Sequence, residues 1–299
     1  MDISVVIGVD TETDIGSFTP FYNGVEKGTP LLMDLFEKKG IPATFFMVAE
    51  AAQKFPELTR EIKQRGFEVG CHTIHHETIG DPLFEIPLVK PVLPEEIPHR
   101  LEVATAMIAE VIGEAPQSFR APRLWGSTIM VNTLEKLGYL ADATYPLYYY
   151  QERVTPYYPS AKDWTQEGNL SILEIPNFAD LTIESHDQYG RDRDQWPLFR
   201  TEGAESLMKH VNSMIAYCSD RNLPAVFCFY IHPWEFIEMP SRLSYGEATV
   251  EPLPFIIQNC GSRALTELSK VIDAFKDKGA HFYSAEGLAH EWRESVKDS

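Results

Sequence analysis

Apolar and polar positions alternate along the chain in blocks that predict strands and helices in turn. Short apolar, β-branched or aromatic runs, typical of buried strands, occupy residues 3–9, 43–48, 67–71, 118–121, 171–175, 225–231 and 281–284, with a weaker run at 139–143. Segments with helical spacing of apolar residues lie between them, at residues 29–39, 51–64, 95–112, 127–137, 202–220 and 262–278. Glycines stand just past five of these segments, where glycine commonly ends a helix.

This alternation over the whole length predicts an α/β fold with a parallel sheet covered by helices. Seven or eight such units closing on themselves would form a distorted (β/α)7 barrel of the TIM type. Three long connections, residues 80–98, 145–168 and 177–201, are rich in Pro, Tyr and Asp, and we interpret them as ordered loops over one face. We therefore expect a single barrel domain that spans residues 1–299.

Composition and charge exclude several classes of partner. The 299 residues include 26 basic and 44 acidic side chains, for a formal net charge of −18. Binding to nucleic acid or to an anionic membrane surface needs clusters of Lys and Arg, which the chain lacks, so we expect neither partner. No apolar stretch approaches the roughly 18–20 residues of a membrane span.

The beginning of the chain and its cysteines indicate a compartment. The first residues show neither the basic region nor the cleavage site of a secretory signal. The four cysteines, Cys71, Cys218, Cys228 and Cys260, are scattered and form no Cys-x-x-Cys pair, as is usual for buried thiols in a reducing compartment. We expect a cytoplasmic protein.

Ionisable residues gather at the ends of four predicted strands. In (β/α) barrels the active site forms at the carboxyl ends of the strands, so these positions are the first candidates for chemistry. They are Asp10, Glu12 and Asp14 after the first strand, His72, His75 and His76 after residues 67–71, Arg120 after 118–119, and His232 after 225–231.

Two of the histidines indicate a metal site. His72 and His76 are four residues apart, so a helical turn after the strand would place both rings on one face, and His75 would then point elsewhere. With one carboxylate from Asp10 or Glu12 they form a two-histidine, one-carboxylate set. Such a set suits a single divalent ion, for which we expect Zn²⁺, with Co, Ni, Fe or Mn as alternatives.

The remaining ionisable groups fit hydrolysis of an amide or ester assisted by that metal. The carboxylate of the Asp10 and Glu12 pair that does not ligate can act as a base, and His232 can act as the acid. Arg120 either pairs with that spare carboxylate and keeps it ionised or forms a salt bridge that closes the barrel rim.

The order of these motifs resembles the polysaccharide deacetylase (NodB-homology) family of carbohydrate esterases. The resemblance extends from the first strand to about residue 240 and implies a distorted (β/α)7 barrel that removes N-acetyl or O-acetyl groups from a sugar. It rests on Asp10-Thr11-Glu12, His72-Thr73-Ile74-His75-His76, Phe119-Arg120-Ala121-Pro122 and Tyr230-Ile231-His232-Pro233.

The resemblance also implies a role for each residue. Asp10 would be the general base and His232 the general acid, with Arg120 paired to the base. The metal ligands would be Glu12, His72 and His76. The family usually has Asp at the position of Glu12, and a longer side chain can still ligate but shifts the ion. The Asp that orients the acid histidine is not recognisable in its usual motif, and Asp142 is the nearest candidate.

Alternatives concern the substrate and the assembly. The His-Pro-Trp-Glu form of the last motif resembles an intracellular subgroup, similar to allantoinase-like and cyclic imide hydrolases, so the second hypothesis is a cyclic amide or ureide hydrolase. The third is a non-catalytic carbohydrate-binding barrel. Six tyrosines and Trp164 within residues 145–164 could stack on a sugar, although we favour a loop anchor or an interface. Exposed aromatic loops of this kind would favour a homo-oligomer.

Overall fold

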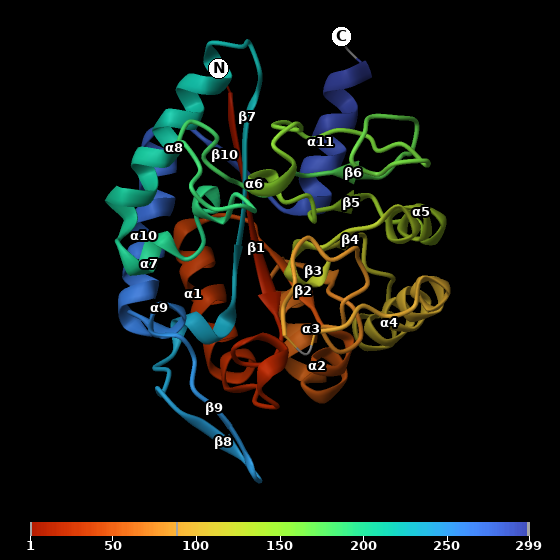
Figure 1. Cartoon of the computed structure of the whole chain (residues 1–299), viewed down its shortest axis with the longest axis vertical. Helices are drawn as coiled ribbons and strands as arrows, with labels where there is room; N and C mark the ends of the chain where they lie inside the picture. Colours follow the sequence, from red (N-terminus) through yellow and green to blue (C-terminus); the bar gives the residue numbers. More distant parts are fainter. Residues whose placement is uncertain (1, 88, 298–299) are drawn as a thin grey trace.

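The computed structural model describes residues 2–87 and 89–297, which form a curled parallel sheet surrounded by helices (Figure 1). The long strand β1 lies between β7 and β2, and the order continues through β3, β4 and β5 to β6. An eighth strand, β10, pairs with the first half of β1. The strands are β1 (Ile3–Thr11), β2 (Thr44–Met47), β3 (Glu68–Cys71), β4 (Ser118–Phe119), β5 (Ala141–Asp142), β6 (Leu173–Glu174), β7 (Ala225–Ile231) and β10 (His281–Tyr283).

The sheet closes into a barrel where the chain leaves β6. Asn177 forms a parallel bridge with Cys228 of β7, and the Phe178 amide donates to the Cys228 carbonyl at 2.8 Å. Seven strands therefore surround the interior, as the alternation of elements predicts. The weakest part of the ladder runs from β4 to β6, where each strand has only two residues and single bridges continue the pairing.

Helices cover the outside of the sheet at nearly the positions that the hydrophobic spacing predicts. They are α1 (Thr29–Lys39), α2 (Ala49–Lys54), α3 (Pro56–Gln64), α4 (Ile97–Ile112), α5 (Thr128–Leu137), α6 (Leu147–Tyr150), α7 (Leu198–Thr201), α8 (Ala204–Ser219), α9 (Pro254–Ile257), α10 (Ser262–Asp277) and α11 (Ala285–Lys297). The predicted single helix over residues 51–64 is two helices, because Pro56 lacks an N–H and begins a new one after the non-helical Phe55.

Several described elements have no counterpart in the sequence prediction, among them the four-residue helices α6, α7 and α9. The helix α11 follows β10, and a two-stranded hairpin, β8 (Leu243–Tyr245) with β9 (Ala248–Val250), projects from the barrel on the side toward which β1 and β7 run (Figure 1). The hairpin strands have only three residues each and are mostly exposed, so hydrophobic alternation does not reveal them.

The tyrosine-rich connection packs against the barrel and is not an exposed platform. Tyr145, Tyr148, Tyr157 and Trp164 are buried, and the rings of Tyr145 and Trp164 make an edge contact with centroids 5.9 Å apart. The favoured interpretation, a loop that anchors itself to the barrel, is therefore confirmed for these four residues, and their rings are not exposed for stacking on a sugar. A homo-oligomer stays a prediction, without the support of that loop.

The cysteines agree with the sequence prediction. Cys71, Cys218, Cys228 and Cys260 are all buried free thiols, as predicted. Among the described residues, no helix combines the length and the apolar character that a membrane crossing requires.

Candidate active site

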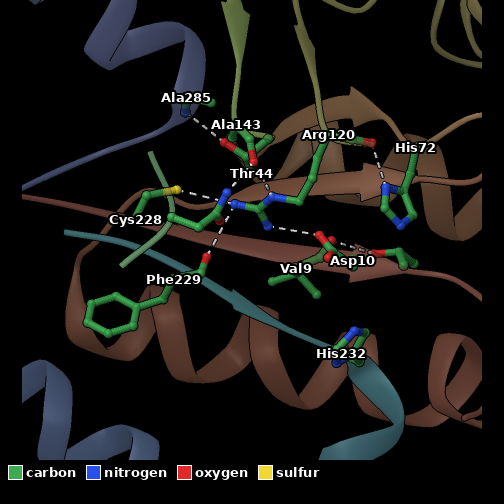
Figure 2. A network of polar contacts seen from close by, with 12 residues as sticks. Val9, Asp10, Thr44, His72, Arg120, Ala143, Cys228, Phe229, His232 and Ala285 are labelled. Atoms are coloured by element: carbon green, nitrogen blue, oxygen red, sulfur yellow. Dashed lines mark hydrogen bonds and ion pairs between the residues drawn. The ribbon is translucent and has the colours of Figure 1, made fainter. Parts of the chain in front are cut away.

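The predicted ionisable residues meet at the carboxyl ends of the barrel strands (Figure 2). β1 extends two residues beyond its prediction, so Asp10 belongs to the strand and Glu12 follows it. His72 follows β3, Arg120 follows β4 and His232 follows β7. This is the edge of the sheet where parallel strands bring residues far apart in sequence together.

Glu12, His72 and His76 form a buried cluster whose ligand atoms all lie within 4.8 Å of one another. His76 Nε2 is 2.5 Å and His72 Nε2 is 3.6 Å from Glu12 Oε2. His72 Nδ1 donates to the Arg120 carbonyl at 2.7 Å, which fixes the tautomer and leaves Nε2 as the atom that faces Glu12. The cluster has the composition of a divalent metal site with open positions.

Two observations show that these residues fit a metal ion. The Oε2 atom of Glu12 is buried, and its approach to His76 does not have the geometry of a hydrogen bond. Burial lowers the pKa of His76 in spite of the nearby Glu12 carboxylate, so the neutral, ligating form of the ring is favoured. A buried carboxylate oxygen beside the imidazoles of His72 and His76 is an arrangement that a cation would stabilise.

The two histidines converge by a different route from the one the spacing predicts. Residues 72–76 form turns, with Thr73 at φ 69° and His76 at φ 60°, so the helical turn expected there is wrong. The ring centroids are nevertheless 5.1 Å apart. His75 points away as predicted, with its ring against Glu50 at 3.0 Å.

Arg120 crosses the barrel interior and pairs with Asp10, as one of the two interpretations of the sequence predicts (Figure 2). Its Nη1 lies 2.8 Å from Asp10 Oδ1, and its Nε donates to the Ala143 carbonyl at 3.0 Å. Its Nη2 lies 3.2 Å from Cys228 Sγ. Because Arg120 is fully buried, its charge needs this carboxylate, and the pair holds Asp10 in a fixed position.

His232 has a partner that the sequence interpretation missed. His232 Nδ1 donates to Glu235 Oε1 at 2.9 Å, and the same oxygen accepts the His232 backbone N–H. Glu235 is fully buried and also accepts from Trp196 Nε1 at 2.9 Å and from Arg200 Nε at 2.6 Å. The signal in the sequence is the Glu three residues after the His, the spacing at which a side chain reaches back to cap a helical turn.

These contacts set the protonation of both groups. Burial alone would lower the pKa of His232, but the hydrogen bond and charge of Glu235 raise it above its ordinary value. Burial alone would raise the pKa of Glu235, but the Arg200 guanidinium and His232 lower it to about 2. The pair is therefore a carboxylate that stabilises a protonated imidazole.

Asp142 does not orient His232, which corrects the assignment made from the sequence. It lies on β5, is in register with Glu174 of β6 and accepts a hydrogen bond from the Thr144 hydroxyl. Burial raises its pKa to about 7, and Glu174 beside it has a pKa well above the ordinary range because of burial and the neighbouring Asp142 charge. The structure thus gives Asp142 a partner within the sheet, and Glu235 occupies the place beside His232.

A cavity of about 340 Å³ opens onto this cluster. Asp10, Glu12, His76 and His232 line it on the side of the barrel. Its other walls are mainly apolar and include the aromatic side chains of Phe18, Phe84, Trp196, Tyr230, Trp234 and Phe255. An amide or ester that enters the cavity would therefore meet the Asp10 carboxylate, the His232 imidazole and the cluster of Glu12, His72 and His76 together.

Comparisons with known proteins agree with this geometry. The family model described as polysaccharide deacetylase matches residues 14–141, which include both histidines of the cluster and Arg120. A peptidoglycan deacetylase of Helicobacter pylori is 30% identical over 168 residues, which cover 50% of this chain and 53% of that protein. A chitooligosaccharide deacetylase of Azorhizobium caulinodans is 25% identical over 111 residues, 37% of this chain and 48% of that protein. The chain thus spans about half the length of these curated relatives.

Similar solved structures extend over almost the whole chain. A protein of Mycobacterium smegmatis described as a polysaccharide deacetylase aligns with a TM-score of 0.64 and 16% identity, covering 98% of this chain and 91% of its own. Puue allantoinase aligns with a TM-score of 0.62 and 16% identity, covering 98% of this chain and 90% of its own. At this identity the likeness concerns the fold, and it supports the (β/α)7 barrel.

Proposed function

We propose that the chain is a member of the polysaccharide deacetylase family, whose model matches residues 14–141, and that it is a metal-dependent hydrolase that removes acetyl groups from N-acetylated or O-acetylated sugars. The observation that carries the proposal is the juxtaposition of three units at one end of the barrel. They are the Glu12, His72 and His76 cluster, the Asp10–Arg120 pair and the His232–Glu235 pair. Each unit matches one requirement of amide hydrolysis.

The cluster supports a single divalent ion. Bound by Glu12, His72 and His76, the ion would polarise the acetyl carbonyl and make the attacking water more acidic. Zinc suits two imidazoles and one carboxylate, and Co, Ni, Fe or Mn are the alternatives for the same donors.

Asp10 is the general base of this proposal. Arg120 holds one carboxylate oxygen, Oδ1, at 2.8 Å, so Oδ2 would take the proton of the attacking water. The ion pair holds the Asp10 carboxylate and the Arg120 guanidinium together in the barrel interior. It also keeps the carboxylate from rotating freely, which preserves the alignment with the reacting water.

His232 is the general acid. Its Nδ1–H is held by Glu235, so Nε2, which lies 3.8 Å from Glu12 Oε1, would deliver a proton to the departing nitrogen or oxygen. Glu235 is the positioning residue for this step, since it fixes the ring and favours its protonated form. After the products leave, His232 takes up a proton from solvent and Asp10 releases its proton to solvent.

A second candidate function uses the same catalytic groups on a cyclic amide or ureide. The mainly apolar walls of the cavity support this candidate too, because they suit a compact ring as well as they suit a sugar. Ring opening of a cyclic amide and removal of an N-acetyl group both cleave a carbon–nitrogen bond, and the two candidates differ in whether acetate is a product.

The experiment that separates the candidates is a substrate panel with and without metal. The purified chain, its chelated form and the form reloaded with zinc are each assayed on acetylated amino sugars, acetylated sugar esters and cyclic amides. Acetate release from sugars that disappears on chelation and returns with zinc supports deacetylation. Ring opening without acetate release supports the second candidate. Saturable sugar binding with no turnover in any form would contradict both and favour a non-catalytic barrel.

A further inference from the structure

Two guanidinium groups that have no role in the proposed reaction line the cavity. Arg123 follows β4, and Arg191 lies in the long connection between β6 and α7. Both side chains are partly buried, which is a costly position for a charge. In a chain whose formal net charge is −18, two cations directed to the substrate cavity are a local exception to the overall charge.

The protein holds Arg123 firmly at the cavity wall. Its Nη1 donates to Thr78 Oγ1 at 3.0 Å and to the His76 carbonyl at 3.3 Å. Arg123 and Leu124 both have left-handed backbone conformations, with φ of 63° and 58°, which residues other than glycine adopt only at an energetic cost. Strain of this kind is typical of ligand clamps, where the rest of the structure fixes one side chain in place.

Arg191 is also oriented by its surroundings. Its Nη1 lies 2.8 Å from Asp194 Oδ2, and its guanidinium carbon is 4.8 Å from the centre of the Tyr148 ring. Tyr230, which lines the cavity, donates to the same oxygen of Asp194 at 2.6 Å. Since a guanidinium has five N–H donors, the ion pair with Asp194 leaves capacity for a further anion.

The remaining walls suit a compact ring. Trp196 and Tyr230 stack with ring centroids 5.8 Å apart, and Trp234 stacks on His232 at 5.2 Å. Aromatic faces at the wall of a cavity of about 340 Å³ fit one or two sugar rings better than a long polymer.

We propose that the substrate is a compact acetylated sugar that carries an anionic substituent, a carboxylate or a phosphate, and that Arg123 and Arg191 bind this substituent. The inference rests on the proposed function, since it concerns the substrate of the same site. Guanidinium groups bind both anions through paired, charge-assisted hydrogen bonds, so the two sources share one chemistry. The aromatic walls would hold the ring while the arginines set its orientation toward Asp10 and His232.

The first arm of the test measures kcat/KM for acetate release from N-acetylglucosamine, N-acetylmuramic acid and N-acetylglucosamine 6-phosphate. The first sugar is neutral, the second carries a carboxylate and the third a phosphate. The wild-type chain is expected to prefer at least one anionic sugar by about tenfold or more, the usual effect of a hydrogen bond to a charged group. Arg123→Gln and Arg191→Gln should reduce this ratio, and Arg123→Lys should keep part of it. Arg100 lies on α4 and forms an ion pair at the surface with Glu96, so Arg100→Gln is the matched control and should leave the ratio unchanged.

The second arm measures binding without turnover. Calorimetry with the metal-free chain compares the binding of glucosamine, muramic acid and glucosamine 6-phosphate. We expect at least one of the two anionic ligands to bind about tenfold more tightly than glucosamine. This difference in affinity should be lost in Arg123→Gln. Equal affinities and equal kcat/KM values in the wild-type chain would overturn the inference, as would ratios that neither glutamine variant changes. Those results leave acetate release itself intact. Conversely, anion binding that depends on Arg123 together with no acetate release from any sugar would support the anion site and contradict the proposed function.

Discussion

At the residue scale, the partner of each ionisable side chain decides its role. Asp10 is paired with the buried guanidinium of Arg120, and His232 is hydrogen-bonded to the buried carboxylate of Glu235, which raises the pKa of the imidazole. The same cavity thus holds a carboxylate fixed by a buried cation and an imidazole fixed by a buried anion, the two groups that we propose as base and acid.

The first prediction concerns the base. Asp10→Asn should lower kcat by about 10²–10⁴-fold, because the amide cannot accept the proton of the attacking water. Bound metal should change little, since the cluster of ligands consists of Glu12, His72 and His76. Acetate release and metal analysis on the same preparation check both statements, and unchanged turnover would refute the role of Asp10.

The second prediction concerns the partner of the acid. In Glu235→Gln the charge that raises the pKa of His232 is absent, so that pKa should fall. Because a general acid works only while protonated, the decline of kcat at high pH should move to lower pH. The measurement is the pH profile of kcat beside the wild-type profile. A loss of kcat with an unmoved profile would show that Glu235 has only a structural role.

At the scale of the elements, the strand β1 both carries the site and leaves room for it. A Cβ atom at Gly8 would lie 2.2 Å from Arg120 Nη1, so only glycine at this position lets the guanidinium pass the strand and reach Asp10. The tight packing between β1 and the loop after β4 is therefore part of the catalytic arrangement.

The third prediction follows from this contact. Gly8→Ala should displace Arg120 and destabilise the fold by about 1–3 kcal/mol, the usual cost of an added methyl group in a packed interior. It should also lower kcat, since Asp10 loses its fixed partner. Denaturant unfolding and acetate release measure the two effects. Wild-type values for both would show that β1 and Arg120 can separate without consequence.

The fourth prediction concerns β5 and β6, where Asp142 and Glu174 meet. Burial raises the pKa of Asp142 from its ordinary 3.8 to about 7, so folding favours the protonated acid. The stability this gives is full below about pH 4 and is lost as pH rises through about 7. Asp142→Asn resembles the protonated acid at every pH, and its free energy of unfolding relative to the wild-type chain should therefore rise by more than about 1 kcal/mol between about pH 5 and pH 8. A constant difference across that range would contradict this account.

At the scale of the whole molecule, the order of strands and helices could be predicted because each buried element has its own hydrophobic pattern. The closure of the barrel through Asn177 and Cys228 and the hairpin β8–β9 could not be, since single bridges and three-residue strands leave no periodic signal. The positions of the ionisable residues at the strand ends were enough to place the site on one face.

The details of the site depend on backbone geometry that the spacing does not reveal. His72 and His76 meet through left-handed turns, although their spacing suggested a helix. The sequence offers Asp142 as the nearest candidate to orient His232. In the structure Glu235, three residues after the histidine, hydrogen-bonds its ring directly. Short local contacts of this kind depend on φ and ψ at single residues, and they become visible only in the structure.

The most direct test of the central claim is metal content measured together with acetate release, for the wild-type chain and for the double variant His72→Ala with His76→Ala. We predict about one divalent ion per wild-type chain and acetate release from an acetylated sugar, and we expect the double variant to lose both. A folded double variant that retains the ion, or a wild-type chain that releases acetate at the same rate after complete removal of metal, would contradict it.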